Sequence, residues 1–121
     1  FQNWSVYKEA IVFVRLADEA CEKLPRERMR SIVDQLRRAS QSIPLNIAEG
    51  SGRYTKAEKV NFFRVARGSV FECTAILDVL RAMPLNIEAD FNSLEERLAS
   101  IGKMLSGFIR FIQKEEPKCD K

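Results

Sequence analysis

Basic side chains that could bind phosphate groups are the clearest chemical feature of this 121-residue chain. Residues 26–67 hold ten Lys or Arg against four Asp or Glu, whereas the remainder holds ten against thirteen. Arginine is the commoner of the two, and its planar guanidinium matches phosphate oxygens. We therefore predict a nucleic-acid-binding patch, most simply for RNA, made of Arg30, Arg37, Arg38, Arg53, Lys56, Arg64 and Arg67.

Helical spacing indicates how these cations could meet. At about 100° per residue, Arg30 and Arg37 share one face of a helix, and Arg64 and Arg67 share an arc of the next. Arg53 lies in the predicted loop between the two helices, so the two arcs could merge into one patch. The alternative is a solvated helix surface on which single arginines pair with acids of the same helices or with a neighbouring subunit.

Histidine, the side chain used most often in acid–base catalysis, is missing. The chain has no histidine, which excludes Ser-His and Cys-His nucleophile pairs, zinc sites that contain histidine, and the Glu-x-x-His ligands of di-iron bundles. Its three cysteines form no CxxC pair, and Cys21 and Cys73 occupy apolar helical positions typical of reduced core residues. We expect no catalytic residue, no metal, no cofactor and no small-molecule substrate.

Residues 37–53, RRASQSIPLNIAEGSGR, form the least generic stretch of the chain. Pro44 lies inside an apolar-periodic helical pattern, where its missing N–H and its ring predict a kink. The short polar side chains near it can satisfy freed backbone groups, and Gly50 and Gly52 suit the left-handed residue that often ends a helix. The expected structural motif comprises Ser42, Pro44, Asn46, Glu49 and Gly50, with Gly68 and Glu72 on the following helix.

Asn46 and Glu49 are three residues apart and therefore share a helix face. With Glu72 opposite, they could be read as an acid–base site, but this cluster lacks a nucleophile, a set of metal ligands and a recognisable oxyanion hole. A polar cluster that ties the kinked helix to its neighbour and to Arg53 is the simpler interpretation.

Four amphipathic helices are needed to position these residues. Apolar residues recur at steps of three and four over about 5–24, 28–49, 56–82 and 89–113. Ser5 and Thr55 are candidate N-caps. We expect one all-α domain over residues 1–113, an antiparallel up-down-up-down four-helix bundle, and a charged, disordered tail over 114–121. Gly68 is expected to permit close approach between helices, as are Gly102 and Gly107.

The central stretch also resembles a known family. The run Ser42-Ile43-Pro44 followed by Asn46-Ile47-Ala48-Glu49-Gly50 is similar to the signature of the bacterial four-helix bundle proteins, the 23S rRNA intervening-sequence proteins. Weaker matches continue in order along nearly the whole chain, at Phe62-Phe63, Gly68-Ser69, Glu72 and Lys103-Met104-Leu105. The resemblance implies a homo-oligomer, a pentamer in particular. The accessory proteins of diversity-generating retroelements are similar in fold and bind nucleic acid as basic pentamers, an analogy at the level of fold.

Two functions therefore stay open. One is a non-enzymatic, oligomeric accessory protein that binds RNA or DNA through the basic patch. The other is an oligomeric scaffold or adaptor that binds another protein and no nucleic acid. No apolar run is long enough to cross a bilayer, so we expect a cytoplasmic bacterial protein without a membrane partner.

Overall fold

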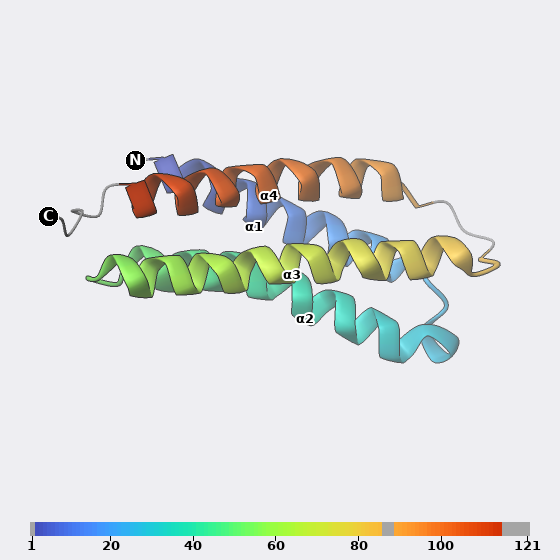
Figure 1. The fold of residues 1–121 in the computed structure, drawn as a ribbon. Helices are drawn as coiled ribbons and strands as arrows, with labels where there is room; N and C mark the ends of the chain where they lie inside the picture. The colour runs from blue at the N-terminus through green and yellow to red at the C-terminus, as the bar shows by residue number, and fades with distance from the viewer. Residues whose placement is uncertain (1, 86–88, 115–121) are drawn as a thin grey trace, which may run out of the picture.

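Four helices make up the fold of the computed structural model, which describes residues 2–85 and 89–114. They are α1 (Gln2–Glu22), α2 (Arg26–Ser51), α3 (Lys56–Ala82) and α4 (Phe91–Lys114). Each runs opposite to the one before it, and each packs against its two neighbours around the bundle (Figure 1). The predicted all-α four-helix bundle is confirmed. No helix among the described residues is long and apolar enough to cross a membrane.

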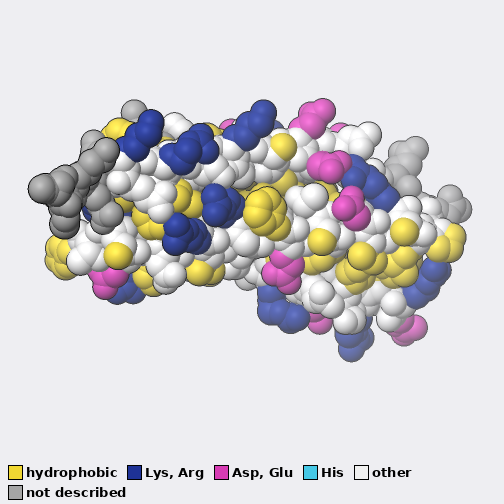
Figure 2. All heavy atoms as spheres, in the orientation of Figure 1, with side chains coloured by type: hydrophobic (Ala, Val, Ile, Leu, Met, Phe, Trp, Pro, Cys, Tyr) yellow, Lys and Arg dark blue, Asp and Glu magenta, His cyan; other side chains and the backbone are white. Residues whose placement is uncertain are grey.

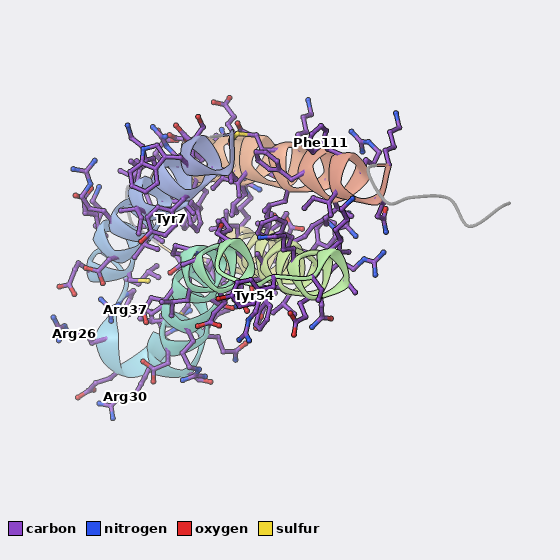
Figure 3. All side chains as sticks on the ribbon, turned by 90° about the vertical axis from the view of Figure 1, so that its left-hand side faces the viewer. Tyr7, Arg26, Arg30, Arg37, Tyr54 and Phe111 are labelled. Carbon is purple, nitrogen blue, oxygen red and sulfur yellow. The ribbon has the colours of Figure 1, made fainter. Side chains whose placement is uncertain are left out.

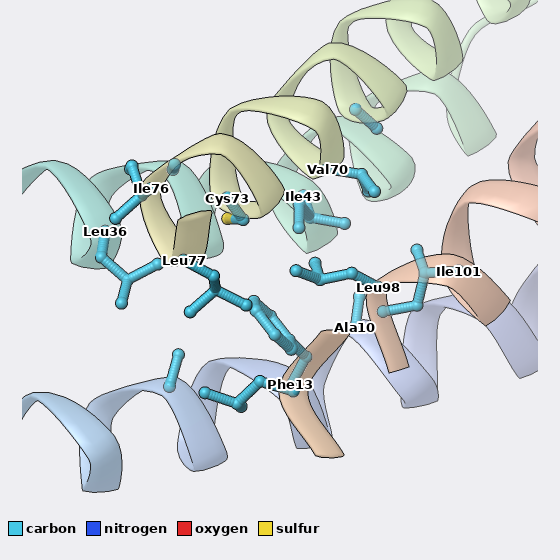
Figure 4. Close-up of a cluster of buried hydrophobic side chains, with 14 of the residues drawn as sticks. Ala10, Phe13, Leu36, Ile43, Val70, Cys73, Ile76, Leu77, Leu98 and Ile101 are labelled. Atoms are coloured by element: carbon cyan, nitrogen blue, oxygen red, sulfur yellow. The ribbon is translucent and has the colours of Figure 1, made fainter. Parts of the chain in front are cut away.

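One continuous core joins all four helices along the bundle axis. Phe13 of α1, Ile43 of α2, Leu77 of α3 and Leu98 of α4 have at most 1% of their surface exposed, and Figure 4 shows their side chains converging. Burying a large apolar side chain contributes about 1.5–3 kcal/mol, so the periodic apolar positions supply the main drive for packing. Cys73 lies in the same cluster, as the helical pattern predicts.

Sequence signals mark the starts of α2 and α3 but not the start of α1. Thr55 caps α3 by accepting a hydrogen bond from the Glu58 backbone N–H at 3.1 Å, and Pro25 holds the N-cap position of α2. Ser5 was the predicted N-cap of the first helix, and this is wrong because α1 begins at Gln2. At the other end of the chain, Lys114 is the last residue of α4. The rest of the predicted tail, 115–121, lies outside the described residues.

Pro44 is buried within α2, which continues past it to Ser51. Close to the proline, the Asn46 side-chain amide donates to the Ser42 carbonyl oxygen at 2.8 Å and to Ser42 Oγ at 3.0 Å. One turn earlier, the Ser40 hydroxyl donates to the Arg37 carbonyl oxygen at 3.0 Å. Short polar side chains thus accompany the helix on both sides of the proline. A bend of the helix axis at Pro44 stays a prediction.

The two glycines at the end of α2 do not have the left-handed conformation predicted for them. No described glycine has a positive φ, and Gly52 has a φ of −89°. The Gly52 N–H instead bonds the carbonyl oxygens of Ala48 and Glu49, both at 3.2 Å, so the helix ends without a left-handed residue. Gly50 serves another purpose, because a Cβ at that position would lie 2.8 Å from the Phe63 ring. Its missing side chain lets α2 and α3 approach closely.

The close approach expected at Gly68 is wrong. A Cβ at Gly68 would meet no atom within 4 Å, because the residue lies on the exposed side of α3. A Cβ at Gly102 would lie 3.6 Å from Val70 of α3, which is ordinary contact, and one at Gly107 would meet only the Arg110 side chain, at 4.0 Å.

Candidate nucleic-acid interface

Arg37, the central cation of the predicted patch, faces the acidic side of α1. Its guanidinium donates to Asp18 Oδ1 at 2.9 Å and to Glu22 Oε2 at 2.8 Å. The hydrogen bond that Arg37 donates to Asp18 is the largest of the influences that raise the pKa of Arg37. Figure 3 shows Arg37 between α1 and α2, with Arg26 and Arg30 along the same edge. Arg37 therefore ties two helices together, the structural alternative that the sequence left open.

The other predicted cations of α2 and the α2–α3 loop differ in their pairing. Arg53 forms an ion pair with Glu49 at 2.8 Å, and its guanidinium carbon lies 4.7 Å from the centroid of the Phe62 ring. Arg30 and Arg38 are exposed and form no ion pair with any described residue. They remain available to a partner, but at the α1–α2 edge and on the outer side of α2.

The cations of α3 approach α4 instead. Arg67 donates to Ser106 Oγ of α4 at 3.2 Å. Arg64 is exposed, Lys56 is half-buried, and neither has an ion-pair partner among the residues that the structure describes. The structure thus separates the predicted patch, because Arg37 bonds acidic side chains of α1 whereas Arg67 bonds Ser106 of α4.

Helix α4 adds cations that the sequence analysis did not include. Lys103, Arg110 and Lys114 are seven and four residues apart, so they share one face of α4. Residues 97–114 contain no Asp or Glu, and neither do residues 59–71 of α3. Figure 2 shows Lys and Arg side chains gathered on the side where these two half-helices lie. We call this surface the α3–α4 basic face, defined by Arg64, Arg67, Lys103, Arg110 and Lys114.

A groove of about 570 Å³ lies between α3 and α4 beside these cations. Its walls are mostly apolar, and the exposed ring of Phe71, with 65% of its surface accessible, forms part of one wall. Lys103 and Arg110 line the same groove. Its one carboxylate among the described residues, Glu95, forms an ion pair with Arg81 at 2.7 Å. The groove therefore combines an apolar surface with positive charge that no carboxylate in its lining neutralises.

The polar residues of the central motif form a link between α2 and α3. The Ser69 hydroxyl donates to Ser42 Oγ at 2.8 Å, and the same oxygen accepts the Asn46 amide. Glu49 forms an ion pair with Arg53 and does not bond to Asn46. Glu72 is exposed and forms no hydrogen bond or ion pair with another described residue. Asn46 and Glu49 thus have separate partners, and the geometry is that of a structural link.

Neither described cysteine is suited to nucleophilic chemistry. Burial raises the pKa of the Cys21 thiol to about 11 and that of the Cys73 thiol to about 12. A thiol that stays protonated at neutral pH is a poor nucleophile and a poor metal ligand. Among the described residues, no three Cys, Asp or Glu side chains gather closely enough to hold a metal ion.

A signal for the α4 cations was present in the sequence. The absence of Asp and Glu from residues 97–114 could have been combined with the seven-residue and four-residue spacing of the basic residues. Phe71 also falls outside the apolar stripe of its own helix, which marks it as an exposed aromatic. Net charge summed over the longer window of residues 26–67 instead favoured α2 and α3.

Comparison with known proteins identifies relatives of the whole fold. The family model described as 23S rRNA-intervening sequence protein matches residues 2–107. A crystal structure from Bacteroides thetaiotaomicron, of a protein with unknown function from the S23 ribosomal protein family, superposes with a TM-score of 0.79 at 18% sequence identity. The match covers 91% of this chain and 99% of that one, and it shows a shared fold. No curated protein matches the chain.

Proposed function

This chain belongs to the 23S rRNA-intervening sequence protein family, and membership alone assigns it no activity. We propose that it is a non-enzymatic accessory protein that binds nucleic acid. Structured RNA is the favoured partner. The observation that carries the proposal is the α3–α4 basic face, where cations from two helices lie together without a carboxylate in either half-helix.

Phosphate binding is the chemistry that this face supports best. Arg64, Lys103, Arg110 and Lys114 form no ion pair with a described residue, so a polyanion would not have to displace an internal partner. Contacts of this kind need no reading of base edges and give binding that weakens steeply with salt. The cations of α2 were also predicted to bind phosphate, but Arg37 already forms ion pairs with two carboxylates of α1.

We further propose that the protein acts as a homo-oligomer, with a pentamer as the favoured state. Exposed apolar side chains on outer helix faces support this, including Trp4 at 59% and Ile11 at 46% accessible on α1. An oligomer would repeat the basic face, so that several weak phosphate contacts add through multivalency. Light scattering should report a mass that is a multiple of 13.9 kDa, and a monomer at micromolar concentration would contradict the proposal.

Two variants of equal charge test where nucleic acid binds. One replaces Arg67, Lys103 and Arg110 with glutamine, and its matched control replaces the exposed α2 residues Arg28, Arg30 and Arg38. Binding of a labelled RNA hairpin is followed by fluorescence anisotropy between about 50 and 200 mM salt. The first variant should bind more weakly and lower the slope of log K against log[salt] by about three, one per lost phosphate contact. The control variant should change the RNA affinity and the salt slope much less.

The outcomes separate the candidate functions. An equal loss in the control would show that cations of α2 also contact the nucleic acid, as the patch predicted on α2 and α3 requires. Absence of salt-dependent RNA binding by the intact oligomer would exclude the nucleic-acid function. It would favour a protein-binding scaffold, which the exposure of Leu45 (64%) and Val79 (49%) on α2 and α3 also supports.

A further inference from the structure

We propose that the groove between α3 and α4 binds one unpaired nucleotide, whose base stacks on Phe71 while Lys103 and Arg110 hold the adjacent phosphates. This inference rests on the proposed function and goes beyond it, because it names the form of nucleic acid that the protein prefers. It predicts that looped or single-stranded RNA binds more tightly than a duplex.

The first argument is the exposure of Phe71 beside a cavity. Single exposed apolar residues are common on protein surfaces, but Phe71 is both 65% accessible and part of a groove wall. The groove volume of about 570 Å³ lies within the range of roughly 300–1,000 Å³ that is typical of ligand sites. The ring therefore offers a flat apolar surface next to a space that a planar group could enter.

The second argument is the charge around this space. Lys103 and Arg110 line the groove, and Arg67 crosses from α3 to Ser106 of α4. The carboxylate of Glu95 is held by Arg81 at 2.7 Å. Apolar walls of low dielectric strengthen the field of the cations in such a cleft. The expected ligand therefore joins a flat apolar group to negative charge.

The third argument selects among ligands of that description. A free phosphate ion has no apolar part, and a duplex keeps its bases stacked inside the helix. An unpaired nucleotide offers both a ring face and a phosphate, which is the combination that single-strand-binding proteins exploit. The α4 cations continue from Lys103 to Lys114, a track of roughly 16 Å at 1.5 Å per residue, so phosphates on either side of the inserted base also have partners.

The floor of the groove depends on Gly102. A Cβ there would contact Val70 at 3.6 Å without a clash, and the residue lines the groove. A larger side chain at this position would occupy the space that we assign to the base. The bundle offers a matched control at Gly68, where a new side chain would meet nothing within 4 Å.

The test compares a labelled single-stranded oligouridylate with a blunt RNA duplex that carries the same number of phosphates, at low salt and measured oligomer mass. Phe71→Ala should weaken single-strand binding by roughly five- to one-hundred-fold, the usual effect of losing one stacked base, and should leave duplex binding unchanged. Phe71→Trp should restore it. Phe111→Ala, which removes a ring of α4 that is 50% accessible and does not line the groove, is the matched control and should have no effect.

A second pair of variants probes the cavity itself. Gly102→Leu should abolish the preference for the single strand, whereas Gly68→Leu should keep it. An oligouridylate with one 2-aminopurine base should show fluorescence quenching on the wild-type protein and none on Phe71→Ala, because stacking quenches this base.

Each remaining outcome overturns the inference in a recognisable way. Equal binding of strand and duplex, unchanged by Phe71→Ala, would refute the stacking site while leaving salt-dependent binding intact. Dissociation of the oligomer in Phe71→Ala would show that the groove is an interface between copies of the chain. Failure of the wild-type protein to bind either RNA would remove the proposed function together with the inference.

Discussion

Replacement of Gly50 by alanine tests whether the contact between α2 and α3 depends on a missing side chain. The new Cβ would lie 2.8 and 2.9 Å from two carbons of the Phe63 ring and 3.1 Å from the Phe62 Cβ. The Phe63 ring has little room to move, since only 2% of the residue is exposed and the ring packs against Phe108 at a centroid distance of 6.4 Å. We expect a less stable protein.

The magnitude follows from two opposing effects. Forcing an extra carbon into a packed core costs about 1–3 kcal/mol, whereas alanine gains about 1 kcal/mol over glycine in a helix. Gly50→Ala should therefore lower the free energy of unfolding by up to about 2 kcal/mol. Gly68→Ala meets no neighbouring atom, so it should keep only the gain and stabilise the protein by up to about 1 kcal/mol.

Urea unfolding of both variants at one fixed protomer concentration measures this difference, because the stability of an oligomer depends on concentration. The two glycine-to-alanine changes share the same chemistry, and only the local space differs. A Gly50→Ala protein as stable as Gly68→Ala would refute the reasoning, since it would show that α2 and α3 separate at no cost.

Three further measurements address other contacts. Arg37→Gln should lower the free energy of unfolding by about 1 kcal/mol, the usual scale of one or two partly exposed ion pairs, and in a double-mutant cycle Asp18→Asn should add little to it. Ser69→Ala removes the hydrogen bond to Ser42 and should cost about 1 kcal/mol in urea unfolding; no change would exclude a stabilising role. Burial raises the pKa of the Cys73 thiol to about 12 from an ordinary value of 9.0. Its contribution to stability is therefore fully present below pH 9 and is lost as pH rises, because only the unfolded chain ionises. Stability should therefore fall between pH 8 and 10 by about 1 kcal/mol more in the wild-type protein than in Cys73→Ala, and equal slopes would contradict this.

The helices and their buried faces could be predicted from local patterns in the sequence. The apolar residues Phe63, Val70 and Leu77 recur at helical spacing, and all three are buried in α3, whose predicted bounds match those observed. Thr55 marked the start of that helix because capping is a local interaction between residues three apart. Signals of this kind depend only on near neighbours in the chain, so they can be read before the fold is known.

The neighbours of each helix face depend on how the four helices pack, which local patterns do not reveal. Helical spacing places Arg37 on one side of its own helix, but the rotation of α2 in the bundle brings it against Asp18 and Glu22 of α1. The rotation of α3, which is likewise set by the packing of the apolar stripes, directs Arg67 toward Ser106 of α4.

The glycines and the exposed ring of Phe71 make the same point. Gly50 and Gly68 are the same residue within helices, yet one faces a buried ring and the other faces open space. The α3–α4 basic face exists only because two half-helices, distant in sequence and each without a carboxylate, lie side by side in the folded bundle. The two half-helices lie side by side because of long-range packing, which the spacing of residues along one helix does not predict.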